Sequence, residues 1–232
     1  TNGECKESSM EQHDREELAE VNAARKGFYE FLASMYKLEL TDEQIGTLTK
    51  QDLPTDAEYV GAGYATVKEY LRHRDSGTRQ ELAVDYARVF LCAGMYEQLM
   101  APPYESVYTS PKRLMMQDAR DEVLAVYRAY GIKKTDDWKE GEDHISLEFE
   151  FEQIMCDRAI DALMANDEKK AFELLSAQLG FLRDHLASWA PMLTADMKRR
   201  AQTKLYLGLA HLTDGFLRTD LQFMEDLLSE EE

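Results

Sequence analysis

Apolar residues recur every three or four positions along most of this chain. This spacing predicts helices that each bury one face. Residues 1–14 are acidic and polar and are expected to be a disordered lead-in, ahead of a domain over 15–228. The first predicted helix follows, with Arg25 as its one polar interruption on the apolar face. That face consists of Leu18, Val21, Phe28, Phe31, Leu32 and Met35.

Sequence signals for the ends of helices divide the chain further. Threonine followed three residues later by Glu or Gln forms a capping box, which predicts a helix start. The chain has three such pairs, namely Thr41/Gln44, Thr55/Glu58 and Thr78/Glu81. Ser110 before Pro111 predicts another start, and Gly131 a helix end.

Residues 145–152 alternate strictly between apolar and polar, which is typical of a strand. We nevertheless predict a helix, because the apolar pattern continues to Leu163 without a turn residue and Glu is poor in strands. Further helices are predicted over 167–189, ended by Pro191, and over 194–217, with a short terminal helix after them. The sequence therefore predicts an all-α fold, a single globular domain of about eight to nine helices with no sheet.

The net charge of −18 restricts the partners that this chain can bind. It disfavours nucleic acid and anionic lipid surfaces, which attract Lys and Arg. It either suits a basic partner or simply keeps the protein soluble. No apolar run approaches the roughly 20 residues that span a bilayer, so no stable membrane insertion is expected. The polar N-terminal stretch resembles no signal or transit peptide, and Cys5, Cys92 and Cys156 form no CxxC pair. We expect a cytoplasmic protein without a disulfide framework.

Motifs for catalysis are absent from the sequence. It contains no GxGxxG, P-loop, HExxH or GxSxG, and no His has a Glu three residues before it as a di-iron bundle requires. We therefore expect no enzyme activity, no catalytic residue, no metal and no cofactor.

Two irregular stretches, 91–110 and 131–143, are candidate functional loops. The second ends in Glu142-Asp143-His144, where Asp143 is expected to cap the following helix. This run is either only a capped helix start or the acidic rim of a site for a basic ligand. Catalysis by Asp143 and His144 is a third reading.

Aromatic residues mark the other loop. Tyr96, Tyr104 and Tyr108 alternate with Glu97 and Glu105, a combination that either pins the loop to the core or forms a peptide groove. Near a later helix end, His185-Leu186 stands before Trp189, which alone indicates a buried stripe with a polar edge.

Taken in order, these segments resemble the TorD/DmsD family of redox-enzyme maturation chaperones. The resemblance covers roughly residues 20–220. Its motifs are a Pro loop with an SVY continuation, Tyr-x-x-x-Gly, an acidic-Asp-His run, HL-x-x-W and Tyr-x-x-Leu-Ala. They are matched at Ala101–Tyr108, Tyr127–Gly131, Glu142–Ile145, His185–Trp189 and Tyr206–Ala210. Gly141 stands where members often have Pro, and Tyr104 where some have Trp.

The resemblance implies a cytoplasmic chaperone whose partners are the twin-arginine signal peptide and the apo form of a molybdopterin oxidoreductase. Such a chaperone holds the enzyme for cofactor insertion before export, and it is a monomer or a homodimer. The residues expected to bind the signal peptide are Tyr104, Glu105, Ser106, Tyr108, Glu142, Asp143, His144, His185 and Trp189. The alternative is an assembly factor for a non-exported or membrane-bound reductase subunit, like the nitrate reductase delta branch.

Overall fold

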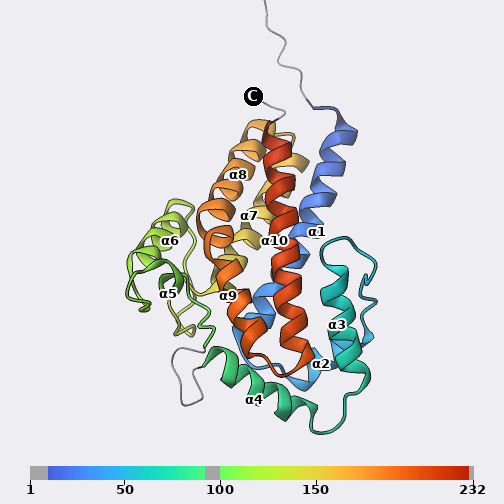
Figure 1. Ribbon diagram of the computed structural model, residues 1–232. Helices are drawn as coiled ribbons and strands as arrows, with labels where there is room; N and C mark the ends of the chain where they lie inside the picture. Colours follow the sequence, from blue (N-terminus) through green and yellow to red (C-terminus); the bar gives the residue numbers. More distant parts are fainter. Residues whose placement is uncertain (1–9, 92–99, 230–232) are drawn as a thin grey trace, which may run out of the picture.

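The centre of the fold is formed by the helices α1 (Gln12–Lys37), α7 (Ile145–Met164), α8 (Glu168–Phe181) and α10 (Lys204–Ser229). Of these, α1 lies along α7 over much of its length (Figure 1). The computed structural model describes residues 10–91 and 100–229. The elements are α1 (Gln12–Lys37), α2 (Asp42–Lys50), α3 (Gly61–Arg72), α4 (Thr78–Phe90), α5 (Glu105–Thr109), α6 (Asp118–Ala129), α7 (Ile145–Met164), α8 (Glu168–Phe181), a π-helical turn (Leu182–Leu186), α9 (Ala187–Arg200) and α10 (Lys204–Ser229). Within the described ranges there is one isolated β-bridge and no sheet, so the predicted all-α class is confirmed.

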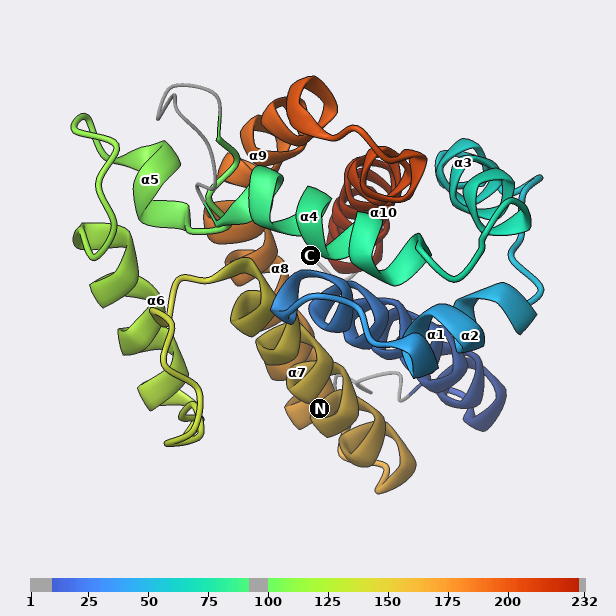
Figure 2. The same cartoon turned by 90° about the horizontal axis from the view of Figure 1, so that it is seen from below.

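The remaining helices surround this centre. α7 packs on α8 as well as on α1, and α10 packs on α3 and α9. Seen from below, α4 crosses the end of the bundle, α5 and α6 lie on one side, and α2 and α3 lie on the other (Figure 2). The irregular segments that flank α5 and precede α7 therefore lie on the α5–α6 side of the bundle.

The start of α7 is buried on all sides, which explains its alternating sequence. Its first residues are buried whether apolar or polar, because α1 covers one side and the α5–α6 region with α8 covers the other. The polar members find partners: Ser146 Oγ donates to the Ala33 carbonyl at 2.8 Å, and Glu148 accepts from Trp189 Nε1 at 3.1 Å. The prediction of a helix at this alternating stretch is confirmed.

Local end signals were only partly reliable. Thr41 and Gln44 form the predicted capping box, and Gly131 ends α6 with a left-handed φ of 66°. Thr55 caps nothing, because α3 begins only at Gly61. Thr78 is the first residue of α4, and Glu81 accepts a hydrogen bond from Tyr70 rather than from a cap.

Ser110-Pro111 does not start a helix. Ser110 instead ends α5, and the chain stays irregular until α6 begins at Asp118. Two residues of this connection, Arg113 and Met116, have left-handed φ values of 52° and 57°, which are incompatible with a helix.

The C-terminal boundaries also differ from the prediction. Pro191 lies inside α9 and does not end it. A proline ring clashes with the carbonyl four residues earlier, here that of Ala187. Ala187 directly follows the π-turn, whose wider backbone leaves room for the ring. The break comes instead before α10, where the Asp85 carboxylate accepts the backbone N–H groups of Gln202 and Thr203. The predicted terminal helix is the continuation of α10.

At the N-terminal end, α1 begins at Gln12, inside the segment expected as a lead-in. Residues 1–9 lie outside the described residues. None of the helices in the described part is long and apolar enough to cross a membrane.

Candidate functional site

Two segments from the irregular stretches pack together into one unit, which we call the two-loop unit (residues 101–110 and 141–145). Its backbones are joined by the bridge between Tyr104 and His144. The Glu105 N–H donates to the Asp143 carbonyl at 3.0 Å, and the Ile145 N–H donates to the Pro103 carbonyl at 2.9 Å. These segments of the two candidate loops therefore lie together, on the α5–α6 side of the bundle (Figure 2). Tyr96 and Glu97 lie outside the described residues.

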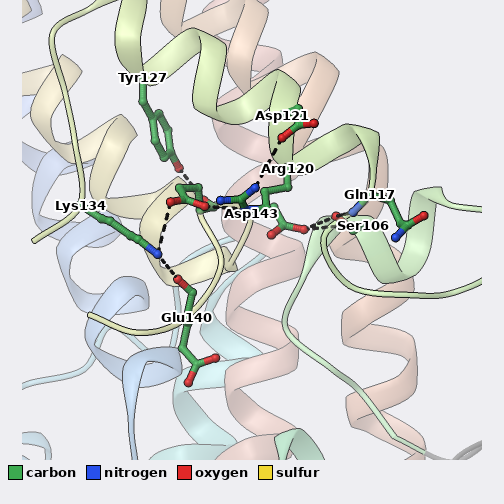
Figure 3. Close-up of polar contacts among 9 residues, drawn as sticks. Ser106, Gln117, Arg120, Asp121, Tyr127, Lys134, Glu140 and Asp143 are labelled. Carbon is green, nitrogen blue, oxygen red and sulfur yellow. Dashed lines mark hydrogen bonds and ion pairs between the residues drawn. The ribbon is translucent and has the colours of Figure 1, made fainter. Parts of the chain in front are cut away.

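Asp143 fastens one loop to the other. Its Oδ2 accepts the Ser106 N–H at 3.0 Å and the Ser106 hydroxyl (Figure 3). The Ser106 Oγ in turn accepts the Gln117 N–H at 3.2 Å, which holds the start of α6. Asp143 is 1% exposed, so its carboxylate faces the interior.

The N-cap of α7 is His144. The sequence had predicted Asp143 for this role. His144 Nδ1 accepts the Ser146 N–H at 3.1 Å, an arrangement that requires a ring nitrogen without a proton. Burial, with a smaller contribution from the charge of Lys37, lowers the pKa of His144 to about 3. A neutral imidazole is therefore available as the cap, and Asp143 is left to bind Ser106.

Glu142 of the two-loop unit is paired with two cations from outside the unit. Its carboxylate is 2.6 Å from Arg120 Nε and 3.3 Å from Lys134 Nζ, and its carbonyl accepts from the Tyr127 hydroxyl at 3.3 Å (Figure 3). Burial alone would raise the pKa of Glu142. Its backbone hydrogen bond and the contacts with Lys134 and Arg120 outweigh that effect, and the pKa is lowered. The carboxylate of Glu142 is therefore already paired with two cations.

A deeper layer joins the unit to the bundle. Glu105 lies 3.0 Å from Nδ1 of His185, which stands in the π-turn, and the Glu148 carboxylate accepts from Trp189. Trp189 also stacks on Tyr108, with 5.5 Å between ring centroids. Burial raises the pKa of both Glu105 and Glu148. The charge of Asp143 raises both further and Glu105 also raises the pKa of Glu148, while His185 acts to lower that of Glu105. A π-turn inside a helix often marks a functional site.

All nine side chains predicted for peptide binding belong to this one cluster. Tyr108 is half-buried and the other eight are buried, so the cluster holds the two-loop unit together from inside. The accessible apolar surface nearby belongs to the connection between α5 and α6. Leu114, Met115 and Met116 are exposed there, Met116 by 63%.

The bundle core contains a second buried network, which was not predicted from the sequence. The Arg25 guanidinium bonds both carboxylate oxygens of Asp220, at 2.6 and 3.1 Å, and donates to Asn22 and Gln178 at 2.8 Å each. Tyr29 donates to the same Asp220 at 2.5 Å. The only sequence signal for this network was a charged residue on the apolar face of the first helix.

Within the described ranges, no three His, Cys, Asp or Glu side chains are arranged to hold a metal ion. Cys156 is buried and hydrogen-bonds Gln178, while Cys5 and Cys92 lie outside the described residues.

Comparison with known proteins gives matches over most of the chain. The model of the nitrate reductase delta subunit family matches residues 53–195. Chaperone protein TorD of Photobacterium profundum is 27% identical over 218 residues, which cover 90% of this chain and 98% of that one. TorD of a Psychrobacter strain is 25% identical over 222 residues, or 91% and 96% of the two chains. A candidate redox enzyme maturation protein of known structure from Archaeoglobus fulgidus covers 87% of this chain and 93% of its own, with 18% identity and a TM-score of 0.44.

Proposed function

The chain belongs to the nitrate reductase delta subunit family as a TorD-like redox-enzyme maturation chaperone, and on this premise we propose that it binds the twin-arginine signal peptide of a molybdopterin oxidoreductase. The binding takes place in the cytoplasm and holds the apo enzyme for cofactor insertion before export. The observation that carries the proposal is the near full-length match to the TorD chaperones.

The charge of the chain supports a basic ligand. At −18 it attracts a peptide with two adjacent arginines over long range, and carboxylates hold guanidinium groups through paired hydrogen bonds. Leu114, Met115 and Met116 offer an adaptable apolar surface for parts of the client other than its arginine pair. We propose that the nine predicted residues contribute to client binding by fixing the two-loop unit beside that surface.

A titration tests the proposal. A synthetic twin-arginine signal peptide is titrated calorimetrically into the full chain, at low and at high salt, beside a matched peptide with both arginines changed to glutamine. We expect binding of the arginine peptide that weakens with salt and is much reduced for the glutamine peptide. Equal binding of both peptides, or binding of neither, would contradict the proposal.

The alternative is assembly of a reductase subunit that has no twin-arginine signal. The match to the nitrate reductase delta subunit model favours it. A pull-down from the native cytoplasm with the full chain as bait separates the two. Retention of an oxidoreductase precursor with a twin-arginine signal supports our proposal, and retention of a reductase subunit without one supports the alternative.

A further inference from the structure

A groove lies between α1 and α2, on the side of the bundle away from the two-loop unit (Figure 2). It encloses a cavity of about 410 Å³. Its apolar wall consists of Phe31 and Met35 from α1 and Leu48 from α2. Met35 and Leu48 are only 2% and 6% exposed, so the accessible apolar surface of the wall is that of the half-buried Phe31. Glu30 and Glu43, one on each helix, also line it and are both exposed. Its size lies within the range of small ligand sites, and two helices of a bundle are a common setting for one.

The groove has negative charge without an internal counter-charge. No Lys, Arg or His is among its lining residues. Within the described ranges, neither Glu30 nor Glu43 forms an ion pair or a side-chain hydrogen bond. Lys26, one turn before Glu30 on α1, is paired with Asp157 on α7 instead.

In the two-loop unit, by contrast, the carboxylates are paired with cations or buried. Glu142 is held by Arg120 and Lys134, and Asp143 is buried against Ser106. An incoming arginine would have to displace the two cations of Glu142. It would also have to enter the interior to reach Asp143, whose Oδ1 is buried and has no hydrogen-bond partner. At the groove, the carboxylates are free and already in solvent.

We infer that the α1–α2 groove is where this chain recognises the arginine pair of its client peptide. The two guanidinium groups bind Glu30 and Glu43, and the apolar side chain that follows them packs on Phe31. This inference rests on the proposed function, because it names the place where the same peptide is bound. Charge complementarity and the adjoining apolar wall select a segment in which arginine and an apolar residue are neighbours.

Conservative variants test the inference on the full chain. The probe is the synthetic twin-arginine peptide, titrated into wild type, Glu30→Gln, Glu43→Gln and the double variant. Glu122→Gln, an exposed glutamate on α6, is the matched control for loss of one charge. We expect each groove variant to weaken binding by about threefold to tenfold, the double variant by more, and the control by less than twofold.

A second measurement guards against a folding defect. Thermal unfolding is compared for all variants, since Glu43 also lies in the first turn of α2 and favours its N-terminus. In wild type, a peptide with a photo-reactive phenylalanine after the arginine pair should cross-link to residues of α1 or α2. If the peptide binds wild type and the double variant equally, and cross-links elsewhere, the inference is overturned while the proposed function stands. If wild type does not bind the peptide, the proposed function itself fails.

Discussion

Replacing Arg25 by Met should remove much of the stability of the bundle core. Arg25 and Asp220 are 4% and 3% exposed, and the guanidinium makes four hydrogen bonds there. In Arg25→Met, Asp220 stays buried with Tyr29 as its remaining donor and no cation. Removing one partner of a buried ion pair leaves the other charge uncompensated, which lowers the free energy of unfolding by about 3–5 kcal/mol. For a domain of this size we expect the melting temperature to fall by roughly 6–20 °C.

Urea unfolding followed by circular dichroism measures this loss, and a double-mutant cycle apportions it. Asp220→Asn added to Arg25→Met removes the stranded charge and should recover at least about 1.5 kcal/mol. Arg183→Met, which breaks the exposed contact with Glu225, is the control and should change stability by less than about 0.5 kcal/mol. A loss below about 1 kcal/mol for Arg25→Met, or a double variant no more stable than that single one, would refute the reasoning.

Three further outcomes are expected from stability measurements. His144→Asn still caps α7 but does not titrate. Because the folded pKa of His144 is lowered to about 3, the unfolded chain alone takes up a proton as pH falls below 6.5. The stability advantage of wild type should therefore shrink by up to about 1.4 kcal/mol per pH unit toward pH 4.5, and an unchanged gap in urea unfolding contradicts this. Burial raises the pKa of Glu152, whose carboxylate is fully buried and has no hydrogen-bond partner in the described part. The unfolded chain alone loses this proton above pH 4.5, so the stability of Glu152→Gln should rise relative to that of wild type as pH rises. Equal pH profiles of stability for the two proteins would refute this. A Cβ at Gly208 would lie 2.7 Å from Val67 Cγ2, so Gly208→Ala should lose about 1–3 kcal/mol in thermal unfolding. Gly180→Ala, with open space around it, should gain about 0.5–1 kcal/mol, and equal effects at the two glycines would show that close α3–α10 packing is not the cause.

The helical class could be predicted because its signals are local. The Thr41 capping box and the Gly131 end involve residues three or four positions apart, and each was found as predicted. The start of α10 could not be found in this way. It depends on Asp85 of α4, more than 100 residues earlier, whose carboxylate accepts the N–H groups of Gln202 and Thr203.

The residues predicted for the candidate site lie close together, but the local contacts of single residues differ from the prediction. The sequence brought out Asp143, His144 and His185, and the structure places them in one cluster. It could not show that His144 takes the cap and Asp143 bonds Ser106, because a helix start with two adjacent capping residues leaves that choice to tertiary contacts. The π-turn that turns His185 toward Glu105 also has no local sequence signal.

Motif residues are prominent in this sequence because the fold needs them inside. Asp143 joins two loops that lie far apart in the chain, and a buried carboxylate with fixed donors tolerates few replacements. Exposed carboxylates on regular helices, such as Glu30 and Glu43, form no motif, because nothing in the folded chain fixes their partners. A ligand that arrives from outside binds most readily to groups that are both unpaired and accessible from solvent, and the unpaired Oδ1 of Asp143 is buried. For a basic peptide, this favours the unremarkable glutamates of the α1–α2 groove over the acidic run that the sequence makes conspicuous.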